Sequence, residues 1–278
     1  MKSGTAIKEM VKEKYSEIVS QSKSGNATSC CGATACCIDD VYNIMSDDYS
    51  MLEGYVVDAD LGLGCGLPTE FAKIKEGDVV IDLGSGAGND AFVARGIIGE
   101  KGKVVGIDFT EAMIERARDN AEKLGYNNVE FRFGDIEKIP VTANTADVIV
   151  SNCVLNLVPD KQKVFREIFR VLKPGGHFSI SDIVIHGEMP QRWKEVAELY
   201  AGCVSGAIQK HEYLRMIDTA GFKNTKLQKE KPIIVPEEIL KQYLDEKEIT
   251  TYKNGKVSIE SITVYAEKPS CDPVAGCC

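Results

Sequence analysis

Residues 78–185 alternate between short apolar runs and amphipathic segments, and this rhythm constrains the fold more than any other feature of the chain. The apolar runs predict strands over 79–83, 103–108, 129–133, 146–151 and 177–183, the last after a turn at Pro174-Gly175-Gly176. The intervening segments predict helices that begin after Asn89 and that span 111–124 and 161–171. Strands that alternate with helices form parallel sheets, because each crossover helix packs back on the sheet. We therefore expect an α/β fold with a mostly parallel sheet.

The segments that flank this core have different patterns. Residues 1–45 combine an amphipathic helix over 5–20 with a loop rich in Ser, Gly, Asn and Ala that carries cysteines. After residue 186 come helices near 191–201 and 212–220, then β-prone runs, of which 258–266 is the clearest. We expect a core domain over 46–185, a small α+β C-terminal domain over 186–270 and a flexible tail over 271–278.

Charge and hydropathy exclude some classes of function. The net charge of -9 argues against a nucleic-acid partner, which would require a basic surface. The sequence has neither a run of 18 apolar residues nor an apolar signal segment, which argues against a membrane partner. These features predict a cytoplasmic protein that acts on a small molecule.

A glycine-rich loop, Asp82-Leu83-Gly84-Ser85-Gly86-Ala87-Gly88-Asn89, directly follows the first predicted strand. Glycines in this position let the backbone turn sharply and approach a ligand closely. The last glycine follows one intervening residue, whereas the dinucleotide motif has two.

Carboxylates follow the next two strands. Asp108 lies twenty residues after Gly88, where a carboxylate accepts hydrogen bonds from ribose hydroxyls, and Asp135 follows the third strand, where it could accept from an adenine amino group. Each aspartate alone could simply cap a helix or a turn. Together with Asp82 they fall at three successive strand ends, which is where open α/β sheets bind ligands.

This succession resembles the Rossmann-like class I methyltransferases over about residues 70–185. The resemblance implies a Rossmann-like methyltransferase fold with S-adenosylmethionine as cofactor. The implied cofactor-binding residues are Asp82, Gly84, Ser85, Gly86, Gly88, Asp108, Phe109, Met113, Gly134, Asp135, Ile136 and Asn152.

Ten cysteines are unusual in a reducing compartment, where disulfides seldom persist, and they point to thiol chemistry or to a soft ion. Cys65, Cys153 and Cys203 come from three separate segments. A single buried cysteine is most often a small hydrophobe. The adjacent pairs Cys30-Cys31 and Cys36-Cys37 lack the two-residue gap of zinc sites.

The segments 58–68, 151–157 and 193–207 are similar to the corresponding segments of arsenite methyltransferases, and the similarity spans nearly the whole chain. It implies that Cys65, Cys153 and Cys203 bind arsenic(III), supplied as arsenite or methylarsenite, and that a further N-terminal cysteine works with Cys65. That cysteine is ambiguous among Cys30, Cys31, Cys36 and Cys37, of which we favour Cys36 or Cys37 because they lie nearer.

The chemistry agrees with these roles. Arsenic(III) is soft, binds three thiolates and retains a lone pair that can attack an activated methyl group. A cysteine pair could return the methylated product to the trivalent state by closing a disulfide, which a thiol reductant such as thioredoxin or glutathione would reopen. No general base is needed beyond thiol deprotonation, in keeping with only three histidines. Cys271, Cys277 and Cys278 could capture arsenite on the tail.

Two alternatives stay open. One is a C- or O-methyltransferase of the quinone or sterol type, because residues 134–140 are typical of those enzymes as well, although it leaves the cysteines unexplained. The other is a non-catalytic, thiol-rich arsenic-binding protein, against which the intact aspartate series speaks.

Overall fold

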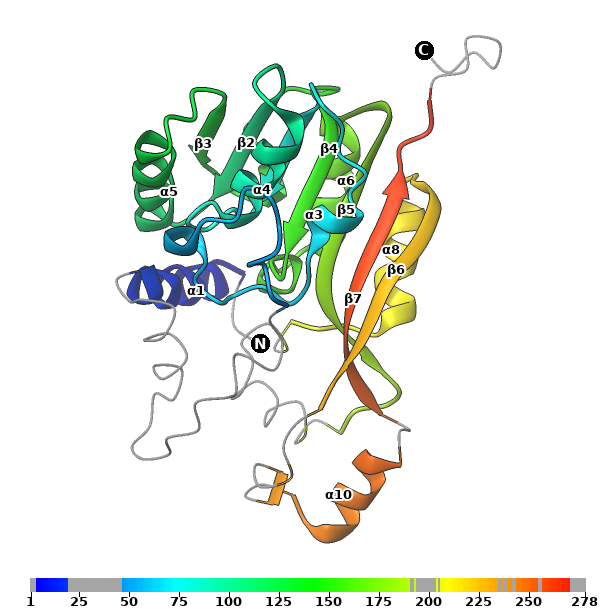
Figure 1. Cartoon of the computed structure of the whole chain (residues 1–278). Coiled ribbons are helices and arrows are strands. Elements are labelled where there is room, and N and C mark those ends of the chain that lie inside the picture. Colours follow the sequence, from blue (N-terminus) through cyan, green and yellow to red (C-terminus); the bar gives the residue numbers. More distant parts are fainter. Residues whose placement is uncertain are drawn as a thin grey trace.

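The structure is a computed structural model of the chain. It describes residues 4–19, 47–190, 193, 204, 206–234, 237, 240–241, 244–254 and 257–270. Figure 1 shows a twisted sheet with helices on both of its faces and helix α1 (Gly4–Val19) below the carboxyl ends of the central strands. Apart from Trp193, the helix expected over 191–201 lies outside the described residues, as do the cysteine-bearing loop and the tail.

The strands of the sheet are β1 (Val79–Leu83), β2 (Lys103–Asp108), β3 (Val129–Phe133), β4 (Ala146–Asn152), β5 (Leu172–His186), β6 (Lys223–Ile233) and β7 (Ser258–Glu267). The other α-helices are α3 (Pro68–Phe71), α4 (Asn89–Ile98), α5 (Glu111–Lys123), α6 (Lys161–Val171), α8 (Lys210–Thr219) and α10 (Glu246–Lys253). Short 3-10 helices are η1 (Val57–Ala59), η2 (Ile136–Lys138) and η3 (Leu155–Leu157).

The sheet has the order β3-β2-β1-β4-β5-β7-β6. Strands β1 to β5 are parallel to their neighbours within this set, and β7 is antiparallel to both β5 and β6. This confirms the expected α/β, mostly parallel sheet. The strand order reverses between β1 and β4, and ligands of such sheets bind at the carboxyl ends beside the reversal.

The C-terminal strands complete this same sheet. Strand β7 pairs with β5 from His177 to His186, so the predicted boundary at residue 185 is not an edge of the sheet. Strand β7 is mostly buried, in agreement with its position inside the sheet. The edge strand β6 is rich in lysine, a residue that discourages further strand pairing. The division into domains stays a prediction.

The turn expected at Pro174-Gly175-Gly176 is instead part of β5. The pairing of β4 with β5 shifts register there, from Ala146 with Leu172 to Val148 with His177. The extra residues therefore form an irregularity in the strand, and regular pairing resumes at His177, where the sequence predicted that the strand begins.

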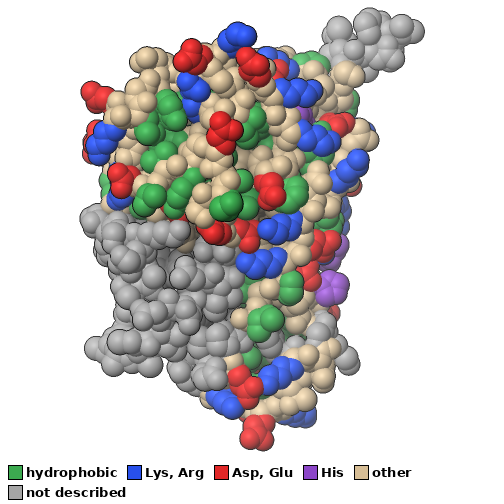
Figure 2. Space-filling model, in the orientation of Figure 1, with side chains coloured by type: hydrophobic (Ala, Val, Ile, Leu, Met, Phe, Trp, Pro, Cys, Tyr) green, Lys and Arg blue, Asp and Glu red, His purple; other side chains and the backbone are tan. Residues whose placement is uncertain are grey.

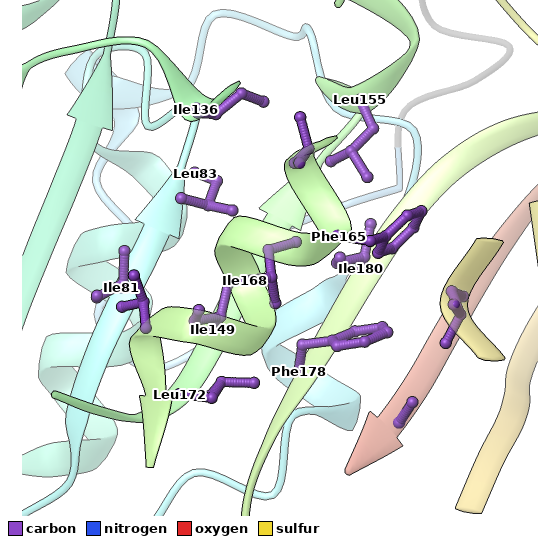
Figure 3. Close-up of a cluster of buried hydrophobic side chains, with 14 of the residues drawn as sticks. Ile81, Leu83, Ile136, Ile149, Leu155, Phe165, Ile168, Leu172, Phe178 and Ile180 are labelled. Atoms are coloured by element: carbon purple, nitrogen blue, oxygen red, sulfur yellow. The ribbon is translucent and has the colours of Figure 1, made fainter. Parts of the chain in front are cut away.

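A hydrophobic core lies on each face of the sheet. Helices α4 and α5 cover one face, and helices α6 and α8 cover the other. Figure 3 shows Phe165 and Ile168 of α6 against Ile81, Ile149 and Phe178 of three neighbouring strands. Because these side chains are fully buried, the central strands form a rigid support for the residues at their ends.

The described surface carries charges of both signs. Figure 2 shows acidic and basic side chains interspersed with hydrophobic ones on the same face. Among the described residues, no helix has the length and apolar character that a membrane span requires.

Asp182 on β5 is a buried carboxyl that should make stability depend on pH. The Ile183 peptide N–H donates to it at 3.0 Å and the Tyr213 hydroxyl donates at 3.3 Å. Burial raises the pKa of Asp182 from 3.8 to about 7, while the charge of Lys161 acts in the opposite sense. Because the folded protein holds this proton more tightly, the resulting stabilisation is fully present below the unfolded pKa and is lost as the pH rises through 7.

The substitution Asp182→Asn should therefore raise the free energy of unfolding at pH 8, by about 4 kcal/mol at most, and should give no such gain at pH 4. Urea unfolding at both pH values measures this difference. The exposed Asp119→Asn provides a control that should change little at either pH. An equal effect of Asp182→Asn at both pH values would contradict the assignment.

Candidate active site

A pocket opens at the carboxyl ends of β1, β2 and β4, beside the reversal of strand order. Helix α1 contributes Lys8 and Tyr15 to its wall. The pocket brings together most of the residues predicted from sequence, namely Asp82, Gly84, Ser85, Gly86, Asp108, Phe109, Met113, Asp135, Ile136, Asn152 and Cys153. Their roles toward a ligand stay predictions.

The glycine-rich loop has a left-handed backbone at Gly84, Gly86 and Gly88, with φ of +72°, +50° and +101°. A Cβ atom on Gly84 would lie 2.3 Å from the side chain of Val154, whereas one on Gly86 would meet only the Met113 sulfur, at 3.9 Å. Gly86 therefore exposes its backbone to open space in the pocket, where a ligand can approach closely.

Gly88 and Gly134 do not line the pocket. A Cβ on Gly88 would lie 2.7 Å from the Phe92 ring, and one on Gly134 would lie 2.7 Å from Pro140. These two glycines allow close packing within the protein, so any contribution to cofactor binding would act through the shape of their loops.

Asp108 is held in a fixed orientation at the end of β2. Its carboxylate accepts hydrogen bonds from the peptide N–H groups of Thr110, at 2.8 Å, and Gly86, at 3.0 Å. Burial raises its pKa even though these bonds favour the charged form. A carboxylate has about four acceptor positions, so Asp108 can also accept from ligand hydroxyls in the pocket.

The surroundings of Asp82 favour a polar, cationic ligand. Its Oδ2 atom is buried, and neither this atom nor Ser85 Oγ has a hydrogen-bond partner among the described residues. Burial, together with the charges of Asp90 and Asp108, raises the pKa of Asp82 well above its usual value. Hydroxyl and ammonium groups of a bound nucleoside cofactor would satisfy these atoms, so the residues present fit S-adenosylmethionine.

Asp135 already has a partner from the N-terminal helix. Lys8 of α1 pairs with its Oδ2 atom at 2.5 Å and also with Glu137, while the Glu137 peptide N–H donates to Asp135 Oδ1 at 2.9 Å. These ion pairs hold α1 against the pocket. Sequence reasoning missed Lys8 because a lysine on an amphipathic helix is typical of an exposed face.

Cys65 and Cys153 come together in one buried cluster, although 88 positions separate them in sequence. They are 0% and 2% exposed, and neither forms a disulfide. Cys153 has a φ of +62°, a left-handed conformation that costs a non-glycine residue about 1 kcal/mol or more. A strained cysteine in the wall of a pocket is typical of a functional site.

Asn152 links these two cysteines. It directly precedes Cys153, and its Oδ1 atom accepts the Cys65 peptide N–H at 3.0 Å. Its Nδ2 atom donates to the Tyr49 hydroxyl at 2.5 Å, and that hydroxyl in turn donates to Asp90 at 3.0 Å. Burial raises the pKa of Asp90 to about 6.

Sequence reasoning did not find Tyr49 or Asp90. Asp90 does follow the glycine-rich loop directly, but an acidic residue in the first turn of a helix is common without any ligand. Tyr49 belongs to no motif.

Cys203, the third predicted arsenic ligand, and Cys36 and Cys37, the favoured partners of Cys65, lie outside the described residues. The residue after Cys203 is described, and this Val204 belongs to the same cluster as Cys65 and Cys153. The cluster is consistent with Cys65 and Cys153 lying near each other, and the three-thiolate arsenic site stays a prediction.

Comparison with known proteins relates the chain to methyltransferases. A family described as a methyltransferase domain matches residues 74–221. The chain is 36% identical over 277 residues to an arsenite methyltransferase of Halobacterium salinarum, covering 95% of this chain and 67% of the relative. An arsenite methyltransferase of Mus musculus is 39% identical over 170 residues, which cover 57% of this chain and 44% of that protein.

A solved structure gives a third comparison. It is an arsenic(III) S-adenosylmethionine methyltransferase from Chlamydomonas reinhardtii, with 32% sequence identity and a TM-score of 0.63. The match covers 82% of this chain and 73% of that one. The chain spans from less than half to about three quarters of the length of these relatives.

Proposed function

The chain belongs to the S-adenosylmethionine-dependent arsenite methyltransferase family, and from this premise we propose that it methylates trivalent arsenic bound by its own cysteine thiolates. The observation that carries the proposal is the pairing of Cys65 with Cys153. The two thiols share a buried cluster, and Cys153 lines a pocket that also contains the glycine-rich loop and Asp108.

The two thiols suit a soft ion. Arsenic(III) prefers sulfur ligands, and its binding promotes loss of the thiol protons, so no separate base is required. We propose Cys203 as the third ligand and arsenite or methylarsenite as the substrate. The apolar neighbours Ile183, Ile185 and Val204 exclude water from the bound arsenic.

The cofactor side of the pocket has a matching set of groups. S-adenosylmethionine, when bound, supplies a methyl group activated by its sulfonium. We propose that Asp108 accepts hydrogen bonds from its ribose, that Gly86 offers its backbone, and that Asp82 receives its cationic part. Because Cys153 lines the same pocket, the thiolate-bound arsenic would face the cofactor.

Regeneration of the site requires reduced thiols. We propose that Cys36 or Cys37 forms a disulfide with Cys65 when the methylated arsenic returns to the trivalent state. A thiol reductant such as thioredoxin or glutathione would then reopen that disulfide. A cytoplasmic location, where such reductants keep thiols reduced, fits this cycle.

One assay tests the proposal. Purified protein is incubated with arsenite, S-adenosylmethionine and glutathione, and the arsenic species are separated by chromatography and measured by mass spectrometry. Methylated arsenic should form only when all three components are present. The double variant Cys65→Ser, Cys153→Ser is the control.

Other outcomes would contradict it. Arsenite that binds without being methylated would indicate a non-catalytic arsenic-binding protein. Methylation of a phenol or quinone at an unchanged rate by the double variant would instead favour the quinone or sterol type of methyltransferase.

A further inference from the structure

Two side chains from different strands bind the peptide groups of Cys65. Its N–H donates to Asn152 Oδ1 at 3.0 Å, and its carbonyl oxygen accepts from Ser261 Oγ at 2.5 Å. Asn152 lies at the carboxyl end of β4, and Ser261 lies on β7. Both polar groups of the Cys65 backbone are thus held by side chains outside its own loop.

The loop also lies directly against these strands. A Cβ on Gly64 would lie 2.7 Å from Asn152 Nδ2, and a Cβ on Gly66 would lie 2.5 Å from Ser181 Oγ. Glycine at position 64 therefore allows the loop to approach Asn152, and glycine at position 66 allows it to pack on Ser181 of β5.

The amide of Asn152 is itself fixed by buried partners. Its Nδ2 atom donates to the Tyr49 hydroxyl, to the Gly66 carbonyl at 2.8 Å and to Asp90 at 3.2 Å. Tyr49 is 4% exposed and Asp90 is 8% exposed, so water competes little for these bonds. The amide thus contacts the cysteine loop, while the residue also lines the pocket, so the cofactor-binding role that the sequence suggested for Asn152 stays a prediction.

From these contacts we propose that Asn152 and Ser261 are positioning residues, which hold the Cys65 peptide so that its thiol stands beside Cys153. The inference rests on the proposed function, because it assigns these residues to the arsenic side of that reaction. It also gives the C-terminal strand β7 a part in the site: Ser261 reaches the cysteine loop from a strand nearly 200 positions away in sequence.

Steady-state kinetics of the full chain test the proposal, with arsenite and S-adenosylmethionine varied separately. Ser261→Ala should raise the KM for arsenite about three- to tenfold, and Asn152→Ala should raise it about tenfold or more. The KM for S-adenosylmethionine should stay within about twofold for both variants. Ser261→Thr, which keeps the hydroxyl, should restore most of the arsenite affinity.

Ser179→Ala is the matched control. Ser179 is a fully buried serine of the neighbouring strand β5, and its hydroxyl has no hydrogen-bond partner among the described residues. This variant should match the wild type in both KM values. Thermal unfolding of every variant identifies any that fail to fold. If Asn152→Ala is one of them, Ser261→Ala, which removes a single oxygen atom, still tests the proposal.

The outcomes are distinct. Unchanged KM for arsenite in Ser261→Ala, or a rise confined to S-adenosylmethionine in Asn152→Ala, would overturn the positioning role while leaving the proposed function intact. A wild-type protein that does not methylate arsenite would overturn the proposed function and this inference with it.

Discussion

Replacing Cys153 by serine is expected to lower kcat/KM for arsenite methylation by about a thousandfold or more, which corresponds to about 4 kcal/mol of transition-state stabilisation. Serine has nearly the same shape, but its oxygen is a hard and weakly acidic ligand that does not replace a thiolate on arsenic(III). The affinity for S-adenosylmethionine should change little, because the thiol belongs to the acceptor side of the pocket. Methylated arsenic measures the first effect, and calorimetric titration with the cofactor measures the second.

Cys271→Ser is the control for the loss of a cysteine as such, since Cys271 belongs to the tail. At saturating arsenite this variant should retain the wild-type rate. A Cys153→Ser protein that methylates arsenite at more than about a tenth of the wild-type rate would exclude Cys153 as an arsenic ligand.

Gly84→Ala is expected to weaken cofactor binding about a hundredfold. The Cβ atom of an alanine at this position would lie 2.3 Å from Val154 Cγ2, and the residue would have to hold a φ of +72°. Because Val154 itself lines the pocket, relief of this clash must move either the loop or the pocket wall. The dissociation constant for S-adenosylmethionine, measured by calorimetry without arsenite, reports the effect.

Gly125→Ala separates the steric clash from backbone strain. Gly125 has a nearly equal φ of +68°, and a Cβ there would have no atom within 4 Å. This variant should lose about 1 kcal/mol of stability and keep the cofactor affinity of the wild type. If the two variants weakened cofactor binding alike, the packing of Gly84 on Val154 would not be the reason that cofactor binding requires glycine at position 84.

Much of the central sheet could be predicted from local sequence patterns. The predicted strands over 79–83, 103–108 and 129–133 coincide with β1, β2 and β3, and the helix predicted over 161–171 coincides with α6. These elements are set by the spacing of apolar residues and by turn residues at their ends, all of which are local. The prediction of a turn at Pro174 to Gly176 was wrong, because pairing with β4 keeps these residues within an irregular strand.

The cofactor side of the pocket could also be predicted. Asp82 and Asp108 lie near the carboxyl ends of neighbouring strands, and the carboxyl ends of parallel strands necessarily meet at one edge of the sheet. The roles of these two carboxylates in ligand binding are predictions that cofactor-binding measurements test.

The sequence alone determined where most strands and helices of the core form, because those depend on residues close together in the chain. Only the tertiary structure decided that β7 pairs with β5, that Ser261 and Asn152 hold the Cys65 peptide, and that Lys8 pairs with Asp135. These contacts join residues about 72 to 196 positions apart. No local pattern specifies such a pairing, because it is selected by how all the buried surfaces pack together.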